Sequence, residues 1–161
     1  VNEYQYSINK AKNVTNIRTR KLNINNVEDK ELLESIINNN IVNSKLYVYD
    51  NKNLIMFYCL GFLKECIYYI KEYNVIAICE YEDDVLNIND ILCDRKYDLD
   101  KVINVLIDSK TKIVNLGFTP NDTDGYEKNM LTGDNDTLFV LKDKENIFKI
   151  NYLMFPILSH A

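Results

Sequence analysis

One carboxylic acid stands out because its predicted surroundings are apolar. Residues 75–81 and 85–93 alternate like two strands of a hairpin. In that register Asp90 lies opposite Ala77 and shares a face with three apolar side chains, Leu86, Ile88 and Leu92. A carboxylate on such a face must be hydrogen-bonded, paired or raised in pKa. A raised pKa suits a general base; the alternative is a structural hydrogen bond to a helix end or loop.

A strand, a charged turn and a helix follow one another in the middle of the chain. Residues 85–93 are strand-like, 98–108 have a helical apolar stripe and 112–117 are strand-like again, which predicts a parallel crossover. The turn before the helix contains Arg95 and Lys96 but no glycine. These two cations predict contacts with a phosphate at the helix N-terminus, and the alternative is an ordinary exposed turn.

The composition limits the class of protein. The chain has 161 residues, of which 47% are hydrophobic and 27% charged, as in globular domains that bury a core. Its net charge of −5 argues against nucleic acid or a membrane surface as the main partner. The sequence has neither a secretory signal nor an apolar run of about 18 residues, which predicts a cytoplasmic protein without a membrane span.

The cysteines and the single histidine do not form a catalytic or metal-binding pattern. None of the four cysteines has a partner at CxxC spacing, and His160 is distant from all of them in sequence, so we expect no metal site. Apolar neighbours around each cysteine predict reduced thiols in the core. Ser159 adjoins His160, but neighbouring side chains of a strand point to opposite faces, which argues against a Ser–His pair.

The other elements are predicted from periodicity and turn residues. Asn26 can cap a helix that runs through Asn38, and Asp98 can cap the crossover helix. Asp83 and Asp84 form the two-residue turn of the hairpin. A buried helix is expected over 54–65 and strands over 4–8, 17–24, 66–70, 137–142 and 149–158. This order predicts an α/β or α+β fold with a mixed sheet, mostly antiparallel with one parallel crossover and flanked by helices.

This order of elements resembles the fold of the GCN5-related N-acetyltransferase (GNAT) family. In that fold the fourth strand splays from the fifth to admit acetyl-CoA, and residues 85–93, 98–108 and 112–117 match the fourth strand, the third helix and the fifth strand. Asn121 followed by Gly125-Tyr126-Glu127-Lys128 resembles the family's Asn-x-x-Ala-x-x-x-Tyr-Glu-Lys stretch, shortened by two residues. The resemblance therefore implies an acyl-CoA N-acyltransferase-like sheet.

Four segments are also similar in amino-acid sequence to acetyltransferase-like proteins of Firmicutes: Leu54–Leu60, Ile67–Ile78, Leu116–Pro120 and Leu153–Ala161. In those bacterial proteins such a segment follows an N-terminal acetyltransferase domain. We expect one acetyltransferase-like domain over residues 1–161. Because the chain starts at Val1 without a methionine, we also expect it to be the C-terminal half of a longer chain.

The resemblance implies transfer of an acetyl group from acetyl-CoA to a small-molecule or peptide amine. It places a general base in the region of Glu80, beside the candidate Asp90 from the hairpin register, and it gives Tyr126 the role of the acid that reprotonates the CoA thiolate. For Glu80 and Tyr126 the alternatives are a solvated strand residue and a loop-packing residue.

The resemblance also places acetyl-CoA along Leu92 and Cys93, with Arg95 and Lys96 near its phosphates. The family's phosphate loop, Arg/Gln-x-x-Gly-x-Gly/Ala, has glycines where this chain has Asp98 and Asp100.

Two carboxylates in that loop oppose the charge of a phosphate. This departure favours a second hypothesis, in which the chain is a catalytically inactive domain that packs on another acetyltransferase domain or regulates it. A third hypothesis is a small-molecule-binding domain that uses the sheet cleft without chemistry.

Overall fold

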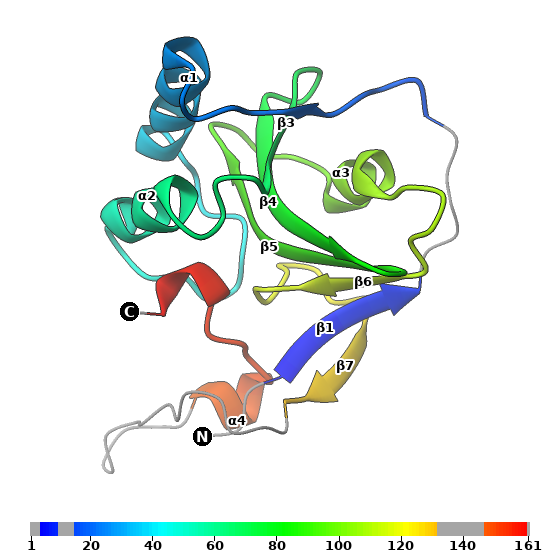
Figure 1. Ribbon diagram of the computed structural model, residues 1–161. Coiled ribbons are helices and arrows are strands. Elements are labelled where there is room, and N and C mark those ends of the chain that lie inside the picture. The colour runs from blue at the N-terminus through cyan, green and yellow to red at the C-terminus, as the bar shows by residue number, and fades with distance from the viewer. Residues whose placement is uncertain (1–3, 10–14, 132–146, 161) are drawn as a thin grey trace.

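The computed structural model describes residues 4–9, 15–131 and 147–160, which form an α+β fold around one mixed sheet (Figure 1). The strands are β1 (Tyr4–Asn9), β2 (Arg20–Lys21), β3 (Ile67–Ile70), β4 (Val75–Glu82), β5 (Val85–Cys93), β6 (Ile113–Leu116) and β7 (Glu127–Met130). The helices are α1 (Val27–Asn38), α2 (Lys52–Leu60), α3 (Leu99–Leu106), α4 (Ile147–Asn151) and the 3-10 helix η1 (Ile157–Ser159). The strand order across the sheet is β2-β3-β4-β5-β6-β1-β7.

The predicted mixed sheet with one parallel crossover is confirmed. β5 and β6 are parallel and are joined through α3, whereas the other neighbouring strands pair antiparallel. Asp98 caps α3 by accepting a hydrogen bond from the backbone N–H of Lys101 at 3.2 Å. The apolar stripe of α3 buries Val102, Ile103 and Leu106 against one face of the sheet.

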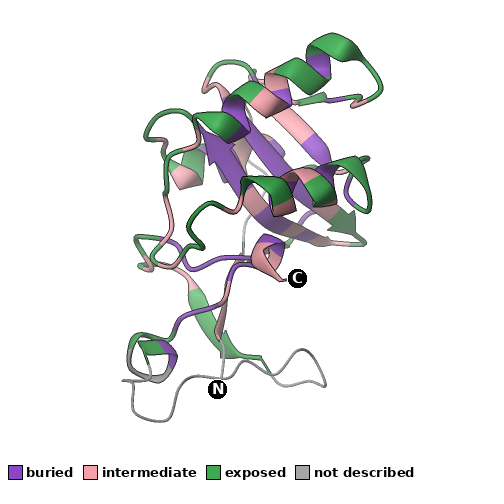
Figure 2. Ribbon diagram, turned by 90° about the vertical axis from the view of Figure 1, so that its left-hand side faces the viewer, coloured by how far each residue is buried: buried purple, intermediate pink, exposed green. Residues whose placement is uncertain are grey.

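α1, α2 and η1 cover the opposite face of the sheet. Leu33, Ile36 and Ile55 from the two helices pack with Ile76, Ile78 and Leu92 of the strands. Figure 2 shows the buried sheet behind helices whose outer sides are exposed. The sheet therefore has one hydrophobic core on each face, which explains why the central strands are apolar on both faces.

The helix expected over residues 54–65 is shorter and less buried than predicted. α2 begins at Lys52 and ends at Leu60, and only Ile55 and Cys59 within it are buried. Phe57 is 57% exposed because α2 lies on the outside of the layer and turns only one face to the sheet. Apolar composition alone does not say which face of a helix meets the core.

The prediction of a strand over residues 149–158 is wrong. That segment forms the end of α4 and then η1, and its backbone bonds to the loop after β6 and, at the Leu153 carbonyl, to the Tyr4 N–H of β1. The N–H of Met154 donates to the Thr119 hydroxyl at 2.8 Å, and the N–H of Ile157 donates to the Gly117 carbonyl at 2.9 Å.

Two other strand predictions have different outcomes. The strand expected over residues 17–24 is confined to Arg20–Lys21. The strand expected over 137–142 lies outside the described residues. Within the described residues, the helices lack the length and apolar content needed to cross a bilayer.

The N-terminus of α1 is fixed by Asp29. Asn26 caps the helix as predicted, accepting a hydrogen bond from the Asp29 N–H at 3.1 Å. The Asp29 carboxylate accepts hydrogen bonds from the backbone N–H of Asn23 at 2.8 Å and from the guanidinium of Arg20. These donors, the Asn23 N–H first, lower the pKa of Asp29.

We expect Asp29→Ala to lower the free energy of unfolding by about 2 kcal/mol at pH 7, because two donors lose their acceptor. Since the folded-state pKa is lowered, this contribution is present above the unfolded pKa of about 3.9 and is lost as pH falls through the folded pKa. Urea denaturation at pH 7 and pH 3 measures it. Glu28→Ala, on the exposed side of the same turn, is the control, and an equal loss in both variants would contradict the prediction.

Candidate functional site

The parallel strands β5 and β6 separate partway along β5. They pair from Val85 and Ile113 to Ile88 and Leu116, and the Gly117 N–H then donates to the Ile88 carbonyl at 2.7 Å. Beyond that bond β5 continues to Cys93 and pairs only with β4. The segment that follows β6 turns away from it. Ligands of open sheets bind at the carboxyl ends of strands that diverge in this way.

A β-bulge at Asn89 changes the face on which Asp90 lies. Cys79 pairs with Ile88, but Ile78 pairs with Asp90, so Asn89 is the extra residue. The predicted pairing of Ala77 with Asp90 is therefore wrong, although the register set by the predicted turn at Asp83 and Asp84 holds as far as Cys79 and Ile88.

Beyond the bulge the two faces of β5 are exchanged. Asp90 shares the face covered by α1 and α2 with Leu92, and it is turned away from Leu86 and Ile88, which pack toward α3. Bulges often re-aim a side chain in this way beside functional sites.

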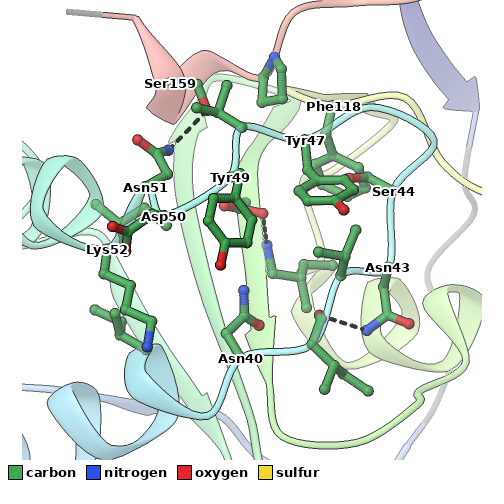
Figure 3. Close-up of a pocket in the computed structure, with 18 of the residues that line it drawn as sticks. Asn40, Asn43, Ser44, Tyr47, Tyr49, Asp50, Asn51, Lys52, Phe118 and Ser159 are labelled. Carbon is green, nitrogen blue, oxygen red and sulfur yellow. Dashed lines mark hydrogen bonds between the residues drawn. The ribbon is translucent and has the colours of Figure 1, made fainter.

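A pocket with a volume of about 430 Å³ opens where the strands separate. Its walls come from both faces of the sheet. β5 contributes Asp90 and Ile91, the turn before α3 contributes Tyr97, and the segment after β6 contributes Phe118. The loop between α1 and α2 closes the remaining side, and Figure 3 shows Asn40, Tyr47 and Tyr49 of that loop around the cavity. Tyr49 is 88% exposed at the pocket, which leaves its ring available to a ligand.

Asp90 supplies a titratable group to this pocket. Its half-buried carboxylate accepts a hydrogen bond from the Ile91 N–H at 2.8 Å. Burial raises the pKa of Asp90 to about 7, and the Ile91 N–H opposes part of that rise. Near neutral pH the carboxyl therefore exists in both protonation states, so it can take a proton from a bound group and release it again.

Tyr97 lies beside Asp90 and was not among the residues predicted to form the site. Burial raises the pKa of Tyr97, and the charge of Asp90 is the next largest cause. Its hydroxyl is therefore protonated near neutral pH and can act as a donor in the pocket. The sequence did carry a signal, because Tyr97 directly precedes the Asp98 cap, a position from which side chains pack onto the first turns of a helix.

Glu80 lies outside the wall of the pocket. It pairs with Asn87 and points away from Cys79 and Tyr81. Its carboxylate accepts a hydrogen bond from the side-chain amide of Asn89 at 2.8 Å. Glu80 thus holds the bulged residue that re-aims Asp90.

Tyr126 also lies outside the pocket wall. The family's corresponding stretch is helical, but Glu127–Met130 forms β7, which pairs antiparallel with β1. Gly125 has a φ of 81°, which suits the turn into this strand. Tyr126 packs on the α3 side of the core, where burial and then the charge of Asp100 raise its pKa.

Of the residues predicted to bind the cofactor, Arg95 and Lys96 are exposed on the turn after β5. The Arg95 guanidinium is already paired, with its Nε 2.7 Å from the Asp94 carboxylate. Asp98 caps α3 and accepts a hydrogen bond from the Lys101 N–H, and Asp100 lies in the first turn, so two carboxylates already stand at this helix terminus. The arrangement does not favour phosphate at this helix terminus.

The other two predicted residues, Leu92 and Cys93, are buried at the end of β5. The Cys93 N–H donates to the side-chain carbonyl of Asn40 at 2.9 Å, and the Cys93 carbonyl accepts from the Ile41 N–H at 2.8 Å. Burial raises the pKa of the Cys93 thiol to about 11, so it is protonated near neutral pH. The backbone of this strand end is therefore already bonded within the chain.

No protein-family model matches the sequence, and no curated protein matches it either. Within residues 4–9, 15–131 and 147–160, no three His, Cys, Asp or Glu side chains form a group that could hold a metal ion. The pocket and the strands around it are therefore the features that indicate a function.

Proposed function

We propose that this chain is an acyl-CoA N-acyltransferase-like domain of the GNAT type, which transfers an acetyl group from acetyl-CoA to a small-molecule or peptide amine. One observation supports this function most. The carboxyl group of Asp90 lies in a pocket at the point where the parallel strands β5 and β6 separate. That is the place where the resemblance puts the reacting thioester.

In the proposed reaction Asp90 is the general base. Its carboxylate takes a proton from the amine, whose nitrogen attacks the thioester carbonyl carbon. The new C–N bond forms, the C–S bond breaks and CoA leaves as a thiolate. A base with a pKa near 7 suits proton transfer at neutral pH. Tyr97, which lines the pocket, takes over the acid role that the resemblance gave to Tyr126; it donates its proton to the thiolate, and the proton held by Asp90 then restores the Tyr97 hydroxyl.

Two observations favour a second function, that of a catalytically inactive domain that packs on a partner acetyltransferase domain or regulates it. Asp98 and Asp100 stand where a phosphate loop needs glycines, and their charges repel a pyrophosphate. The Cys93 backbone is also bonded to Asn40 and Ile41. The exposed rings of Phe57 and Phe62, with centroids 6.0 Å apart, would then belong to the surface that meets the partner.

Thermal unfolding with acetyl-CoA separates the two functions. At 100 times its dissociation constant the ligand adds roughly 2.7 kcal/mol of stability, which corresponds to a rise in Tm of about 5 °C or more for a chain of this size. ATP at the same concentration is the control, because it carries phosphates but no thioester arm. If millimolar acetyl-CoA leaves Tm unchanged, the enzyme hypothesis fails for the chain as it stands and the second function is favoured.

A further inference from the structure

Residues 40–45, which we call the plug, lie between the diverging ends of β5 and the chain that follows β6. On the first side, the Ile41 N–H donates to the Cys93 carbonyl at 2.8 Å, and Asn40 accepts from the Cys93 N–H at 2.9 Å. On the other side, the Lys45 N–H donates to the Thr119 carbonyl at 2.9 Å. Ser44 and Pro120 form an antiparallel bridge there. The plug thus bonds to both strand continuations after they have separated.

These contacts use the groups that an extended ligand would need. Past Ile88, β5 has a strand partner on one side only, so its outward N–H and C=O groups require other partners. A ligand that carries amides can add to such an edge as an extra strand does. At Cys93 the plug already supplies one acceptor and one donor in that position. The plug and an extended amide ligand therefore exclude each other at Cys93.

The plug is held mainly by polar contacts. The Asn43 side chain donates to the Cys93 sulfur at 3.1 Å and to the Ile41 carbonyl at 3.2 Å. Ile41 is 36% exposed and Val42 47% exposed, so little apolar surface ties the plug to the core. At the far end of the loop, Asn51 donates to the Leu158 carbonyl and to the Ser159 hydroxyl. A segment anchored outside the groove, and bound inside it by hydrogen bonds, can leave the strand edge without unfolding the sheet.

We propose that the plug competes with acetyl-CoA for the edge of β5, so that acetyl-CoA binds only after residues 40–45 have moved away from Cys93. This inference rests on the proposed function. The two amides of the acetyl-CoA arm take the place of the Asn40 side chain and the Ile41 backbone. The free chain therefore holds its own groove closed.

Two variants open the plug. Asn40→Ala removes the acceptor of the Cys93 N–H, and Ile41→Pro removes the donor to the Cys93 carbonyl. Each should tighten acetyl-CoA binding at least about tenfold in isothermal titration, because less of the chain is in the closed state. Asn39→Ala is the matched control, since the Asn39 side-chain amide donates to the Ser35 carbonyl at the C-terminal end of α1.

A third variant locks the plug. Asn43→Cys brings a thiol to the position that now contacts the Cys93 sulfur. Oxidised glutathione then converts the two thiols to a disulfide, accepting two electrons and two protons and becoming two reduced glutathione molecules. The oxidised variant should not bind acetyl-CoA, and reduction by dithiothreitol should restore binding. Asn43→Ser under the same treatment is the control, because it cannot form the cross-link.

Equal affinity in the oxidised and reduced forms of Asn43→Cys would overturn the plug and leave the proposed function standing. If no variant binds acetyl-CoA, either the proposed function or the plug has failed. Alkylation of the buried Cys93 by iodoacetamide, followed by mass spectrometry, shows which of them it is. Faster alkylation in Asn40→Ala and Ile41→Pro without binding would show an open groove that acetyl-CoA does not enter. That result would overturn the proposed function and the competition with it. Unchanged alkylation would overturn the plug itself.

Discussion

Asp90→Asn should lower kcat/KM for acetyl transfer by about 100-fold or more, while the affinity for acetyl-CoA changes little. The amide has the shape of the carboxyl but cannot accept a proton from the amine. Because the pKa of Asp90 is about 7, wild-type kcat/KM should rise with pH up to about 7 and then level off. Initial rates between pH 5 and 9 measure both effects, and the variant should lack the inflection.

Glu80→Gln is the matched control for this prediction. Glu80 contacts Asn89 and lies outside the pocket wall, and the amide oxygen of Gln can still accept the hydrogen bond from Asn89. We expect a loss of less than about tenfold and a retained inflection near pH 7. An Asp90→Asn variant that keeps the wild-type rate and pH profile would remove Asp90 from the chemistry.

The same residue makes the stability of the fold depend on pH. The unfolded carboxyl has a pKa of about 3.9, and burial raises the folded value to about 7, so the folded chain holds an additional proton between these values. This contribution is fully present below about pH 4 and is lost as pH rises through 7. At pH 8, Asp90→Asn should therefore unfold with a free energy roughly 2–4 kcal/mol higher than the wild type, and at pH 4 the two should be similar. Urea denaturation at the two pH values checks the sign.

Gly117→Ala should lower the free energy of unfolding by about 2–3 kcal/mol, since it overpacks the point where β5 and β6 separate. A Cβ atom at Gly117 would lie 2.7 Å from the Asn89 carbonyl oxygen and 2.9 Å from the Asn89 Cα. Both are backbone atoms of the bulge and cannot rotate away. The strands must therefore move apart beside Asp90, and the hydrogen bond from Gly117 to Ile88 should weaken.

Urea denaturation at pH 7 gives the change in stability, and amide exchange at Gly117 reports on the bond to Ile88. Asn121→Ala, at an exposed position a few residues further on, is the control and should change stability by less than about 0.5 kcal/mol. A Gly117→Ala variant as stable as this control would show that the two chains do not approach so closely.

The elements predicted correctly are those whose signals are local. Asn26 and Asp98 cap their helices as expected, because a cap depends only on the next few residues. The two-residue turn at Asp83 and Asp84 fixes the register as far as Cys79 and Ile88. A hairpin carries its own alignment, so the start of β5 is correct.

The bulge also has a local signal, one that the hairpin prediction did not use. From Leu86 to Asn89 apolar and polar residues alternate along β5, after which Asp90 is polar again and Ile91 and Leu92 are both apolar. Two polar residues in succession shift the alternation by one position, as an inserted residue does. Counting that shift would have placed Asp90 on the α1 side of the sheet.

The pocket itself could not be predicted, because its walls meet only through tertiary contacts. Asn40 and Cys93 are bonded although 53 residues separate them, and no periodicity joins them. The same holds for β1, which lies between β6 and β7 although it begins the described chain. The resemblance indicated the region around Asp90, but it could not show that residues 40–45 already occupy the edge of β5.

Amide hydrogen exchange with and without acetyl-CoA measures directly whether the edge of β5 binds this ligand. Binding there should slow exchange at Ile91 and at Gly117–Phe118, speed it at Ile41 and Lys45, and leave β3 unchanged. Unchanged exchange along β5 at saturating acetyl-CoA, or protection confined to other strands, would contradict acetyl-CoA binding in this groove.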